Sequence, residues 1–587
     1  MRKSHDSVFT VGIGGAAGDG IRESGSTLGA ILTELGYESF MSFTYPSLIR
    51  GGHNFARITF SKDKVYSDHE ALDVLIALNE ESIVLHRAEM AENSAVLADS
   101  FEPADIEVLK ENAVVVPMAA TVKEMGVAAI TRNSMALGAL CYLLDLDFDL
   151  MQKVLEDVFK NKMPEVNIKL ADKGYQLLKE KGFRHAKKIE PSDGKKEFMD
   201  GNEALARGLM AADLDFYVGY PMTPATSLLQ YLAGRQLNSN LRVIQPESEL
   251  AVINMALGMS YAGKRVAVGS ASGGFALMQE AFSNAGMAEL PLVVAVSQRQ
   301  APATGLPTYS SQTDLRFVIH AGHGEFPRIV IAPGDAEESF KLGADALNLA
   351  WKYQLPVIVL MDKIISEHAA SCELKSDTVK IEQGSMAAIG RPSEIAAKAS
   401  QSTVNDSTNQ YRRYQITADG ISPMAFPGTP NTVIKVTSYE HDESGITTEE
   451  AKETESMINK RFAKAETLKK SLDHHETVKV YGDRASKDVV VFWGSTKGPV
   501  LEAARYIKKP VKFVQIVWLE PFDTKKVAHE LSGARKIINI ECNRDAQMAN
   551  LIKEKTGIEA TDMILKFDSR PFEPVTLAER INEIMQR

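Results

Sequence analysis

The stretch "LDFYVGYPMTPATSL" (residues 214–228) joins a short apolar run to two prolines that flank one threonine. The apolar run is typical of a strand buried in a parallel sheet, and Pro221 favours extended backbone at Tyr220. Pro224 suits the first turn of a helix, so Thr223 is predicted to be the N-cap at a strand-to-helix junction. In an open parallel sheet such a junction lies at the carboxyl edge of the strands, where ligands bind.

The same alternation of strand-like and helix-like segments extends along most of the chain. It predicts an α/β protein with several doubly wound parallel-sheet domains. We expect one domain over residues 1–185, a second over 198–375 and a third over 487–587. The polar stretch 376–486 is too long for an idle linker, so we expect an extended connector that packs across a partner or a neighbouring domain.

Composition narrows the class of protein. The 587 residues are 44% hydrophobic and 24% charged, which is typical of a globular protein. The net charge of −11 argues against a nucleic-acid partner. No run approaches the roughly 18 apolar residues of a membrane span, and the N-terminus lacks the apolar core of a signal peptide. We therefore expect a soluble, cytoplasmic protein without a membrane partner.

The three cysteines stand singly at Cys141, Cys372 and Cys542. They form no CxxC pair and are too few for a four-cysteine iron–sulfur or zinc site. We therefore predict no metal site in this chain, and any metal cluster that it uses must come from another chain.

The glycine loop "GIGGAAGDGIRESG" (12–25) matches neither of two known signatures. Its spacing departs from the GxGxxG of dinucleotide-binding domains, and no acidic ribose ligand follows the next strand. As a thiamine diphosphate signature it is also weak, because "GDG" at 18–20 is followed by "GHN" at 52–54 rather than by two asparagines. Two interpretations remain: backbone N–H groups that receive an anion at a helix start, or a turn that only lets helix and strand approach closely.

The segment "QPESELAVINMALGMSYAG" (245–263) predicts a helix that is apolar on nearly every side and therefore buried. A carboxylate in its first turn would lie where water is scarce. It either stabilises the helix dipole or hydrogen-bonds a heterocycle, where a low dielectric sharpens its effect on proton position. The helical pattern does not separate Glu247 from Glu249.

Two further segments place polar or glycine residues after strands. In "KRVAVGSASGGF" (264–275) a strand runs into a glycine turn at 272–274, and in "PLVVAVSQRQAPATGLPTYSSQTDL" Arg299 follows an apolar strand. An arginine at this edge is either a member of an ion pair or an anion receptor. Because Thr223, Glu249 and Arg299 are expected at the same edge, their convergence favours a binding site.

These segments resemble a known family. "YPMTP", "PESELAV", "GSASGGF" and "RQAPATGLPTYSSQTDL" are similar to motifs of the alpha subunit of 2-oxoacid:ferredoxin oxidoreductases, and "TYPSLIRGGHN" is similar to the gamma domain fused in front of it. "YEHDESG", "IECNRDAQMANLI" and "KFDSRPFEP" resemble 2-oxoglutarate-type members in particular. The resemblance implies a gamma domain over 1–185, a pyrimidine-type thiamine diphosphate domain over 198–375, and a transketolase C-terminal-like domain over 487–587.

The resemblance also implies an activity. It is the thiamine-dependent, reversible oxidative decarboxylation of 2-oxoglutarate with coenzyme A to succinyl-CoA and CO₂, with the electrons passing to ferredoxin. A separate beta subunit would carry thiamine diphosphate, Mg²⁺ and a four-iron four-sulfur cluster, in a dimer of heterodimers. The alternatives are a subunit specific for pyruvate or a branched-chain 2-oxoacid, and a non-catalytic scaffold subunit.

Site residues follow from the same resemblance. Glu249 would contact the aminopyrimidine of the cofactor and act in catalysis together with Thr223 and Arg299. The residues expected around the 2-oxoacid are Tyr220, Thr223, Arg299 and Thr304, and those expected near the cofactor, besides Glu249, are Ser272, Gly273 and Gly274. The loop after "LPT" lacks a basic residue for a distal carboxylate, so Arg50 or His53 would meet that carboxylate or coenzyme A.

Overall fold

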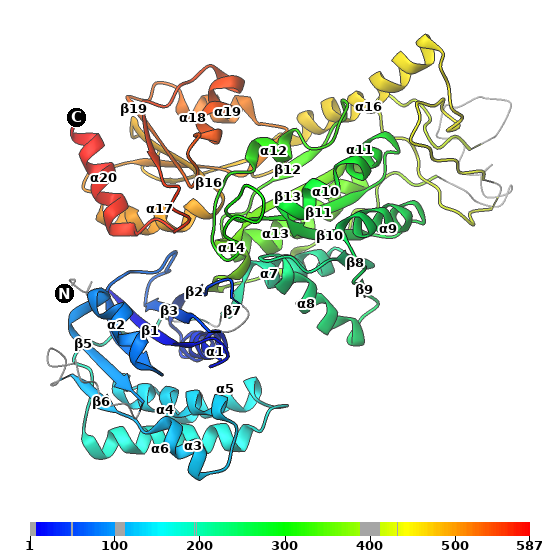
Figure 1. The fold of residues 1–587 in the computed structure, drawn as a ribbon. Helices are drawn as coiled ribbons and strands as arrows, with labels where there is room; N and C mark the ends of the chain where they lie inside the picture. Colours follow the sequence, from blue (N-terminus) through cyan, green and yellow to red (C-terminus); the bar gives the residue numbers. More distant parts are fainter. Residues whose placement is uncertain are drawn as a thin grey trace.

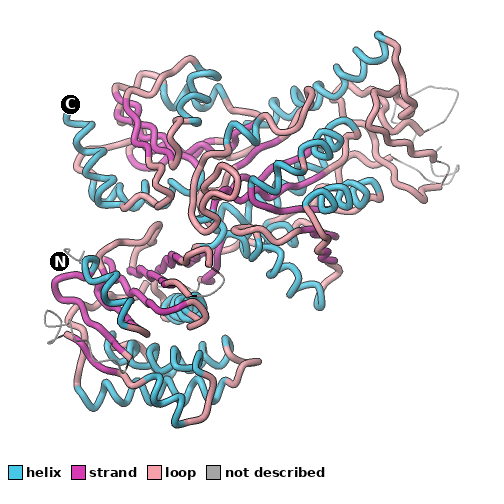
Figure 2. Tube along the Cα trace, viewed as in Figure 1, coloured by secondary structure: helices cyan, strands magenta, loops and turns pink. Residues whose placement is uncertain are grey.

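The computed structural model describes residues 7–48, 51–99, 112–192, 194, 196–387, 411–430 and 432–587. Three parallel-rich sheets, each with its own helices, form three units (Figures 1 and 2). In Figure 1 the N-terminal unit lies below, the central unit in the middle and the C-terminal unit above. The predicted α/β class is confirmed.

The first sheet has eight strands in the order β6-β5-β4-β1-β3-β2-β14-β7. Its strands are β1 (Val8–Ala16), β2 (Glu38–Thr44), β3 (His53–Ser61), β4 (Leu72–Ala77), β5 (Met90–Ala98), β6 (Ala113–Val115), β7 (Glu197–Asp200) and β14 (Ala369–Cys372). The sheet is mixed, because β1 pairs parallel with β4 but antiparallel with β3. The strands β7 and β14 come from chain beyond residue 185, so this sheet ties the first unit to the second.

Helices cover the first sheet and extend below it (Figure 1). They are α1 (Ile21–Glu34), α2 (Glu80–His86), α3 (Met118–Glu124), α4 (Arg132–Leu144), α5 (Phe148–Val158) and α6 (Pro164–Lys181). The glycine loop turns directly into α1, whose N-cap is Gly20 at φ 74°. A Cβ at Gly14 would lie 2.7 Å from Ser82 Oγ, so the loop needs glycine for close approach, which agrees with the second of its two interpretations.

The central sheet has seven strands in the order β18-β12-β13-β11-β10-β8-β9. Its strands are β8 (Phe216–Gly219), β9 (Arg242–Ile244), β10 (Val266–Ala271), β11 (Leu292–Gln298), β12 (Ile329–Ile331), β13 (Pro356–Asp362) and β18 (Trp518–Glu520). All pairs are parallel except β12 with β18, a strand that the C-terminal unit contributes. The buried, nearly continuous apolar strands are those expected of a sheet with helices on both faces.

The helices of the central unit connect its parallel strands. They are α7 (Gly201–Ala211), α8 (Thr226–Arg235), α9 (Glu249–Tyr261), α10 (Ser272–Leu277), α11 (Gln279–Met287), α12 (Leu315–Ile319), α13 (Ala336–Tyr353) and α14 (Lys363–Glu367). A single hydrophobic cluster joins residues of this sheet, such as Val294, to residues of the C-terminal sheet, such as Val514. The two units therefore share one core.

The third sheet has five strands in the order β15-β17-β16-β19-β20. Its strands are β15 (Val478–Gly482), β16 (Asp488–Trp493), β17 (Lys512–Ile516), β19 (Lys536–Glu541) and β20 (Asp562–Leu565), and its helices are α17 (Lys497–Ala503), α18 (Thr524–Leu531), α19 (Gln547–Thr556) and α20 (Pro574–Gln586). The edge strand β15 lies within the stretch expected to be a connector.

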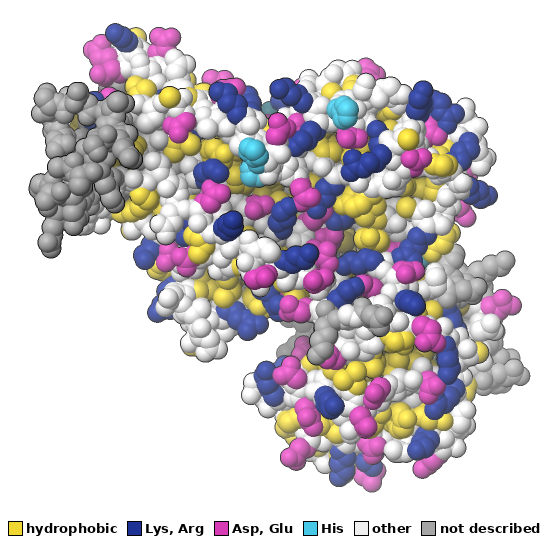
Figure 3. All heavy atoms as spheres, turned by 180° about the vertical axis from the view of Figure 1, so that it is seen from behind, with side chains coloured by type: hydrophobic (Ala, Val, Ile, Leu, Met, Phe, Trp, Pro, Cys, Tyr) yellow, Lys and Arg dark blue, Asp and Glu magenta, His cyan; other side chains and the backbone are white. Residues whose placement is uncertain are grey.

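A long helix, α16 (Ala451–Ser471), precedes this unit and packs on the central one. The ammonium group of Lys460 lies 2.7 Å from a carboxylate oxygen of Glu289, and both side chains are buried. The connector therefore packs across a neighbouring unit through a buried ion pair. On the face of the molecule shown in Figure 3, basic and acidic side chains are interspersed.

Candidate active site

The carboxyl ends of neighbouring central strands carry most of the predicted site residues. Tyr220 and Thr223 follow β8, Ser272 follows β10, and Arg299 follows β11. Glu249 begins α9 directly after β9. Since β11, β10, β8 and β9 are consecutive in the parallel sheet, these residues lie along one edge of it.

The structure corrects the predicted role of Thr223 as an N-cap. A turn closed by the N–H of Ala225 to the carbonyl of Met222 (2.9 Å) separates Thr223 from the helix, and α8 begins only at Thr226. The N-cap position belongs to Ala225, which has no side-chain cap. The carbonyl of Thr223 instead accepts a hydrogen bond from Arg299 Nη1 (2.9 Å), so the threonine faces the sheet edge.

The sequence could not decide which of two glutamates is buried, and the structure decides it. Glu247 is exposed, whereas Glu249 is only 4% exposed. Glu249 Oε1 is buried without any hydrogen-bond partner in the described part of the chain. A buried carboxylate oxygen without a partner is costly, so Glu249 is suited to meet a donor that this chain does not supply.

The glycine turn expected at 272–274 is instead the first turn of α10, and Gly274 lies against this carboxylate. A Cβ on Gly274 would lie 2.6 Å from Glu249 Oε1 and 2.1 Å from Ser270 Oγ, so no larger residue fits there. A Cβ on Gly273 would meet nothing within 4 Å, so this glycine borders open space. Gly274 therefore allows the backbone to approach Glu249 closely, whereas Gly273 borders open space.

The apolar sequence of α9 predicted a helix buried on nearly every side, but the structure buries only one face of it. One face packs in the core through Val252, Ile253 and Ala256. The opposite face exposes Leu250 (55%) and Met255 (37%). The pattern was misread because an apolar surface that this chain leaves uncovered looks, in sequence, the same as a core surface.

Arg299 lies at the same edge without an anionic partner. Its guanidinium donates to the Thr223 carbonyl, and within the described ranges no carboxylate lies at ion-pair distance from it. Burial lowers the pKa of Arg299 from its ordinary value. A half-buried, unpaired guanidinium is suited to bind a carboxylate from outside the chain.

The hydroxyl of Ser272 is already used within the protein. Its Oγ donates to Asp314 Oδ2 (2.6 Å), and Asp314 itself lies beyond the loop that follows β11. Burial raises the pKa of Asp314, and the Ser272 hydrogen bond partly opposes that rise. Ser272 is therefore held in place by a residue that the sequence reasoning missed.

Thr304, expected near the substrate, is exposed on its loop. Thr308 in the same loop is 4% exposed, and its Oγ1 is buried without a hydrogen-bond partner in the described structure. Thr308 belongs to the motif "RQAPATGLPTYSSQTDL", but the sequence gave no signal for its burial. Neighbouring loop residues do not show which of two threonines faces inward.

Asp362, at the end of β13, is a second residue that the sequence reasoning missed. It caps α14 by accepting from the N–H of Ile364 (3.0 Å) and Ile365 (3.1 Å), and Ser495 of the C-terminal unit donates to its other oxygen. Burial raises the pKa of Asp362 to about 6. Its position at the end of an apolar strand is a sequence signal by which it could have been identified.

Of the two residues expected for a distal carboxylate or coenzyme A, the structure describes only His53. Arg50 is outside the described residues. His53 begins β3, and its Nε2 lies 2.9 Å from Nε2 of His86 in the same unit. Burial, together with the charge of His86, lowers the pKa of His53. This contact therefore joins β3 to α2 within the N-terminal unit.

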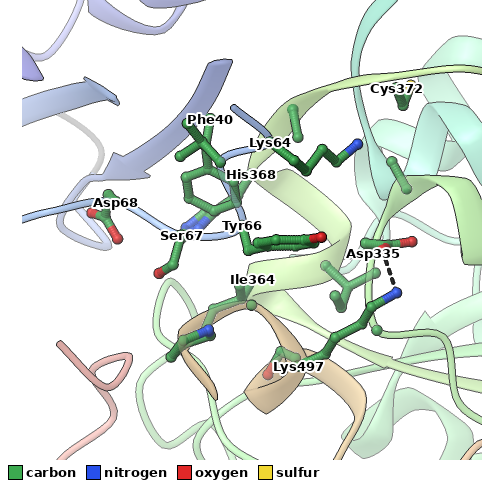
Figure 4. Close-up of a pocket in the computed structure, with 18 of the residues that line it drawn as sticks. Phe40, Lys64, Tyr66, Ser67, Asp68, Asp335, Ile364, His368, Cys372 and Lys497 are labelled. Atoms are coloured by element: carbon green, nitrogen blue, oxygen red, sulfur yellow. Dashed lines mark hydrogen bonds and ion pairs between the residues drawn. The ribbon is translucent and has the colours of Figure 1, made fainter. Parts of the chain in front are cut away.

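A small cavity marks the junction of all three units (Figure 4). It measures about 50 Å³, and its walls include Phe40, His368 and Lys497. Lys497 pairs there with Asp335 at 2.5 Å. This volume suits water rather than an organic acid, so the cavity is part of the packing between the units.

The fold and the site define a class: an α/β protein with a candidate ligand site at the carboxyl edge of a parallel sheet. Among the described residues, this site offers one carboxylate oxygen without a hydrogen-bond partner and one guanidinium without an ion-pair partner. Comparisons with known proteins identify the family. Residues 207–460 match the model "Pyruvate flavodoxin/ferredoxin oxidoreductase, thiamine diP-bdg", and residues 10–177 match "Pyruvate ferredoxin/flavodoxin oxidoreductase".

Relatives extend over nearly the whole chain. The 2-oxoacid:ferredoxin oxidoreductase subunit alpha of Saccharolobus solfataricus is 32% identical, over 98% of this chain and 97% of its own. The 2-oxoglutarate synthase subunit KorA of Methanothermobacter thermautotrophicus is 26% identical, over 66% of this chain and 98% of its own. The 2-oxoglutarate:ferredoxin oxidoreductase of Magnetococcus marinus, solved with 2-oxoglutarate, coenzyme A and succinyl-CoA bound, matches with a TM-score of 0.85 and 32% identity over 99% of this chain and 100% of its own.

The chain belongs to the 2-oxoacid:ferredoxin oxidoreductase family, as a subunit of the fused gamma–alpha kind. It is therefore part of an oxidoreductase and contains the family's thiamine diphosphate-binding domain. Within the described ranges, no helix is both long and apolar enough to cross a bilayer.

Proposed function

We propose that this chain is the alpha subunit of a 2-oxoglutarate:ferredoxin oxidoreductase, which converts 2-oxoglutarate and coenzyme A to succinyl-CoA and CO₂ and passes electrons to ferredoxin. A beta subunit carries thiamine diphosphate, Mg²⁺ and a four-iron four-sulfur cluster. The observation that carries the proposal is the buried, unpartnered Oε1 of Glu249 at the edge of a thiamine diphosphate-binding domain.

Glu249 fits the aminopyrimidine of the cofactor. The carboxylate is nearly buried, Gly274 lets the backbone approach it closely, and the adjacent Gly273 borders open space. In this low-dielectric position, Oε1 accepts a hydrogen bond from a ring N–H and so controls where the proton resides. When bound, thiamine diphosphate supplies the carbon nucleophile for the substrate ketone.

Arg299, Thr223 and Tyr220 fit the 2-oxoacid. Arg299 has donors left after its bond to the Thr223 carbonyl and binds the carboxylate next to the ketone. The Thr223 hydroxyl donates to the ketone oxygen, where negative charge develops, which lowers the barrier because the donor is already in place. Tyr220, 37% exposed, borders the opening of the site.

An exposed apolar surface supports the need for a partner. Leu250 and Met255 are exposed on α9, the helix that Glu249 begins, and Leu277 at the end of α10 is 53% exposed. We call Leu250, Met255 and Leu277 the α9/α10 face. An apolar patch beside a binding site is typical of a surface that another subunit covers, and covering it would also keep water away from Glu249.

The preference for 2-oxoglutarate is supported by relatives. KorA is named a 2-oxoglutarate synthase subunit, and the Magnetococcus enzyme was solved with 2-oxoglutarate bound. The pyruvate and branched-chain alternatives predict a different order of turnover rates, which the assembled complex can measure directly.

The test is a reconstituted complex with the partner chain. Glu249→Gln should lower the rate of 2-oxoglutarate decarboxylation by about 100-fold or more, because general acid–base groups contribute about 10²- to 10⁴-fold. Ferredoxin reduction and CO₂ release measure the rate, and bound thiamine diphosphate is assayed in the same preparations. Glu247→Gln, an exposed neighbour of the same type, is the matched control and should keep wild-type rates.

Three results would contradict the proposal. Full activity of Glu249→Gln in a cofactor-loaded complex would support a scaffold subunit. Full activity of this chain without a partner would remove the shared site. Faster turnover of pyruvate or a branched-chain acid than of 2-oxoglutarate would leave the family assignment intact but replace the substrate.

A further inference from the structure

The loop after β11 lacks a basic residue of its own for a second carboxylate, and the fold brings one to it from the C-terminal unit. The guanidinium carbon of Arg570 lies 3.8 Å from the centre of the Tyr309 ring. Tyr309 directly follows Thr308, so a cation lies beside the part of the loop where the sequence offered none.

Arg570 is held over this ring by its own turn. Ser569 is 8% exposed and has a φ of 67°, which is uncommon for a residue other than glycine. The N–H of Arg570 donates to Asp568 Oδ1 (3.0 Å), while Lys566 neutralises the other oxygen of Asp568 (2.6 Å). The turn therefore directs the arginine without using its guanidinium as an ion-pair partner.

The guanidinium of Arg570 is the available cation of an adjoining cavity. This cavity measures about 180 Å³, and Arg570, Tyr309 and Thr308 line it together with Arg57 and Lys363. Arg57 is bound by Asp68 (3.2 Å) and Glu89 (2.5 Å). In the described structure, no carboxylate lies within ion-pair distance of Arg570, whose one polar guanidinium contact is a long bond to the Asp568 carbonyl (3.4 Å).

Two further charged groups that line the cavity are also committed. Lys363 donates to the Phe43 carbonyl and lies 3.8 Å from Glu367, and burial lowers its pKa to about 8. Glu573 accepts from the N–H of Thr576 (2.6 Å) as the cap of α20. The unpartnered Oγ1 of Thr308 is a neutral donor in the same walls.

The two ends of the loop meet, which connects this cavity to Arg299. The N–H of Gln300, next to Arg299, donates to the carbonyl of Tyr309 (3.2 Å). Arg299, which would bind the first carboxylate, therefore lies at one end of this closed loop, and Arg570 stacks on Tyr309 at the other end.

We propose that Arg570, stacked on Tyr309, binds the distal carboxylate of a dicarboxylic 2-oxoacid and so selects it over monocarboxylic ones. The inference rests on the proposed function and assigns its substrate preference to a residue of the C-terminal unit. An arginine with its face on an aromatic ring keeps its edge donors free for a bidentate carboxylate.

The test compares two substrates in the reconstituted complex. Arg570→Gln should raise the KM for 2-oxoglutarate about 10- to 100-fold, as expected for loss of a charge-assisted hydrogen bond. Its kcat/KM for 2-oxobutanoate should change by no more than about twofold, a difference within the usual effect of a surface substitution. Arg544→Gln, an exposed arginine of the same unit paired only with Asp545 at 3.8 Å, is the control for altered surface charge.

The outcomes separate this inference from the proposed function. Selectivity for 2-oxoglutarate that survives Arg570→Gln would overturn the inference alone. An equal loss with both acids, or a raised KM for coenzyme A alone, would also overturn it, because the arginine would then act elsewhere. A wild-type complex that oxidises 2-oxobutanoate but not 2-oxoglutarate would overturn both.

Discussion

At the residue scale, the site depends on charged side chains that lack either a hydrogen-bond partner or an ion-pair partner in the described part of the chain. Glu249 Oε1 and the guanidinium of Arg299 are the two charged examples at the edge of the central sheet. Burial of such groups is unfavourable for the isolated chain, and it is offset only when a ligand or a partner supplies the missing contacts. Because these two side chains destabilise the folded chain, their presence at one edge of the sheet indicates a functional site.

Asp362 gives a prediction of pH dependence at this scale. Its pKa of about 6 in the folded chain lies above that of an unfolded aspartate, which is about 3.9. The folded state therefore binds the proton more tightly, so the contribution of this carboxyl to stability is fully present below about pH 4 and is lost as the pH rises through 6. The loss is at most about 3 kcal/mol for a shift of this size.

Asp362→Asn should remove this dependence. The amide cannot ionise and still accepts the two N–H groups of α14 through its oxygen. The thermal midpoint of the variant, relative to wild type, should rise between pH 4 and pH 7 and stay level above. A constant difference across that range would mean that burial does not set the protonation of this residue.

At the scale of elements, α16 shows how a polar helix is fixed to a hydrophobic unit. Glu289 accepts from Lys460 through both oxygens (2.7 and 2.8 Å) and pairs with Lys464, and all three side chains are buried. Burial alone would raise the pKa of Glu289, but the two ammonium groups outweigh burial and hold that pKa well below its ordinary value. The helix is therefore attached by charge within the protein interior.

Lys460→Met should detach this helix in part. Breaking a buried pair leaves an incompletely compensated charge, which costs on the order of 3 kcal/mol. We expect a lower thermal midpoint and faster proteolysis near α16. Lys469→Met on the same helix, which breaks an exposed pair with Glu466, should leave the thermal midpoint nearly unchanged because solvent screens that pair. Equal effects of the two variants would show that burial adds nothing to the Lys460 pair.

At the scale of the whole molecule, the units are joined by shared strands and by a shared core. β7 and β14 extend the first sheet, β18 extends the second, and one hydrophobic cluster crosses from the central to the C-terminal unit. Arg570 and Ser495 reach the central site across these junctions. The units therefore act as one scaffold, and the α9/α10 face is the surface that we propose another subunit covers.

Substitutions on the α9/α10 face should weaken assembly without unfolding the chain. Met255→Asp combined with Leu277→Asp places charges where the partner should bury apolar surface, and we expect the dissociation constant to rise by about 10-fold or more. Analytical ultracentrifugation of the mixed subunits measures it. Leu237→Asp, at an 87% exposed position on another surface, is the control. Unchanged association would place the partner elsewhere.

The sequence by itself determined the features that depend on neighbouring residues. The apolar strands, the glycine turns and the positions of Glu249, Thr223 and Arg299 after strands were predictable, because strand ends in a parallel sheet meet at one edge. The helical pattern within 245–263 also predicted the existence of α9, which occupies Glu249–Tyr261 of that segment.

Only the tertiary structure decided which of these residues are buried and what meets them. It chose Glu249 over Glu247 and Thr308 over Thr304, left one face of α9 exposed, and brought Arg570 to Tyr309. Burial and pairing depend on contacts between segments far apart in the chain, so no local pattern contains them. The local sequence therefore defines the edge of the sheet, and the packing of three units defines the chemistry that this edge presents.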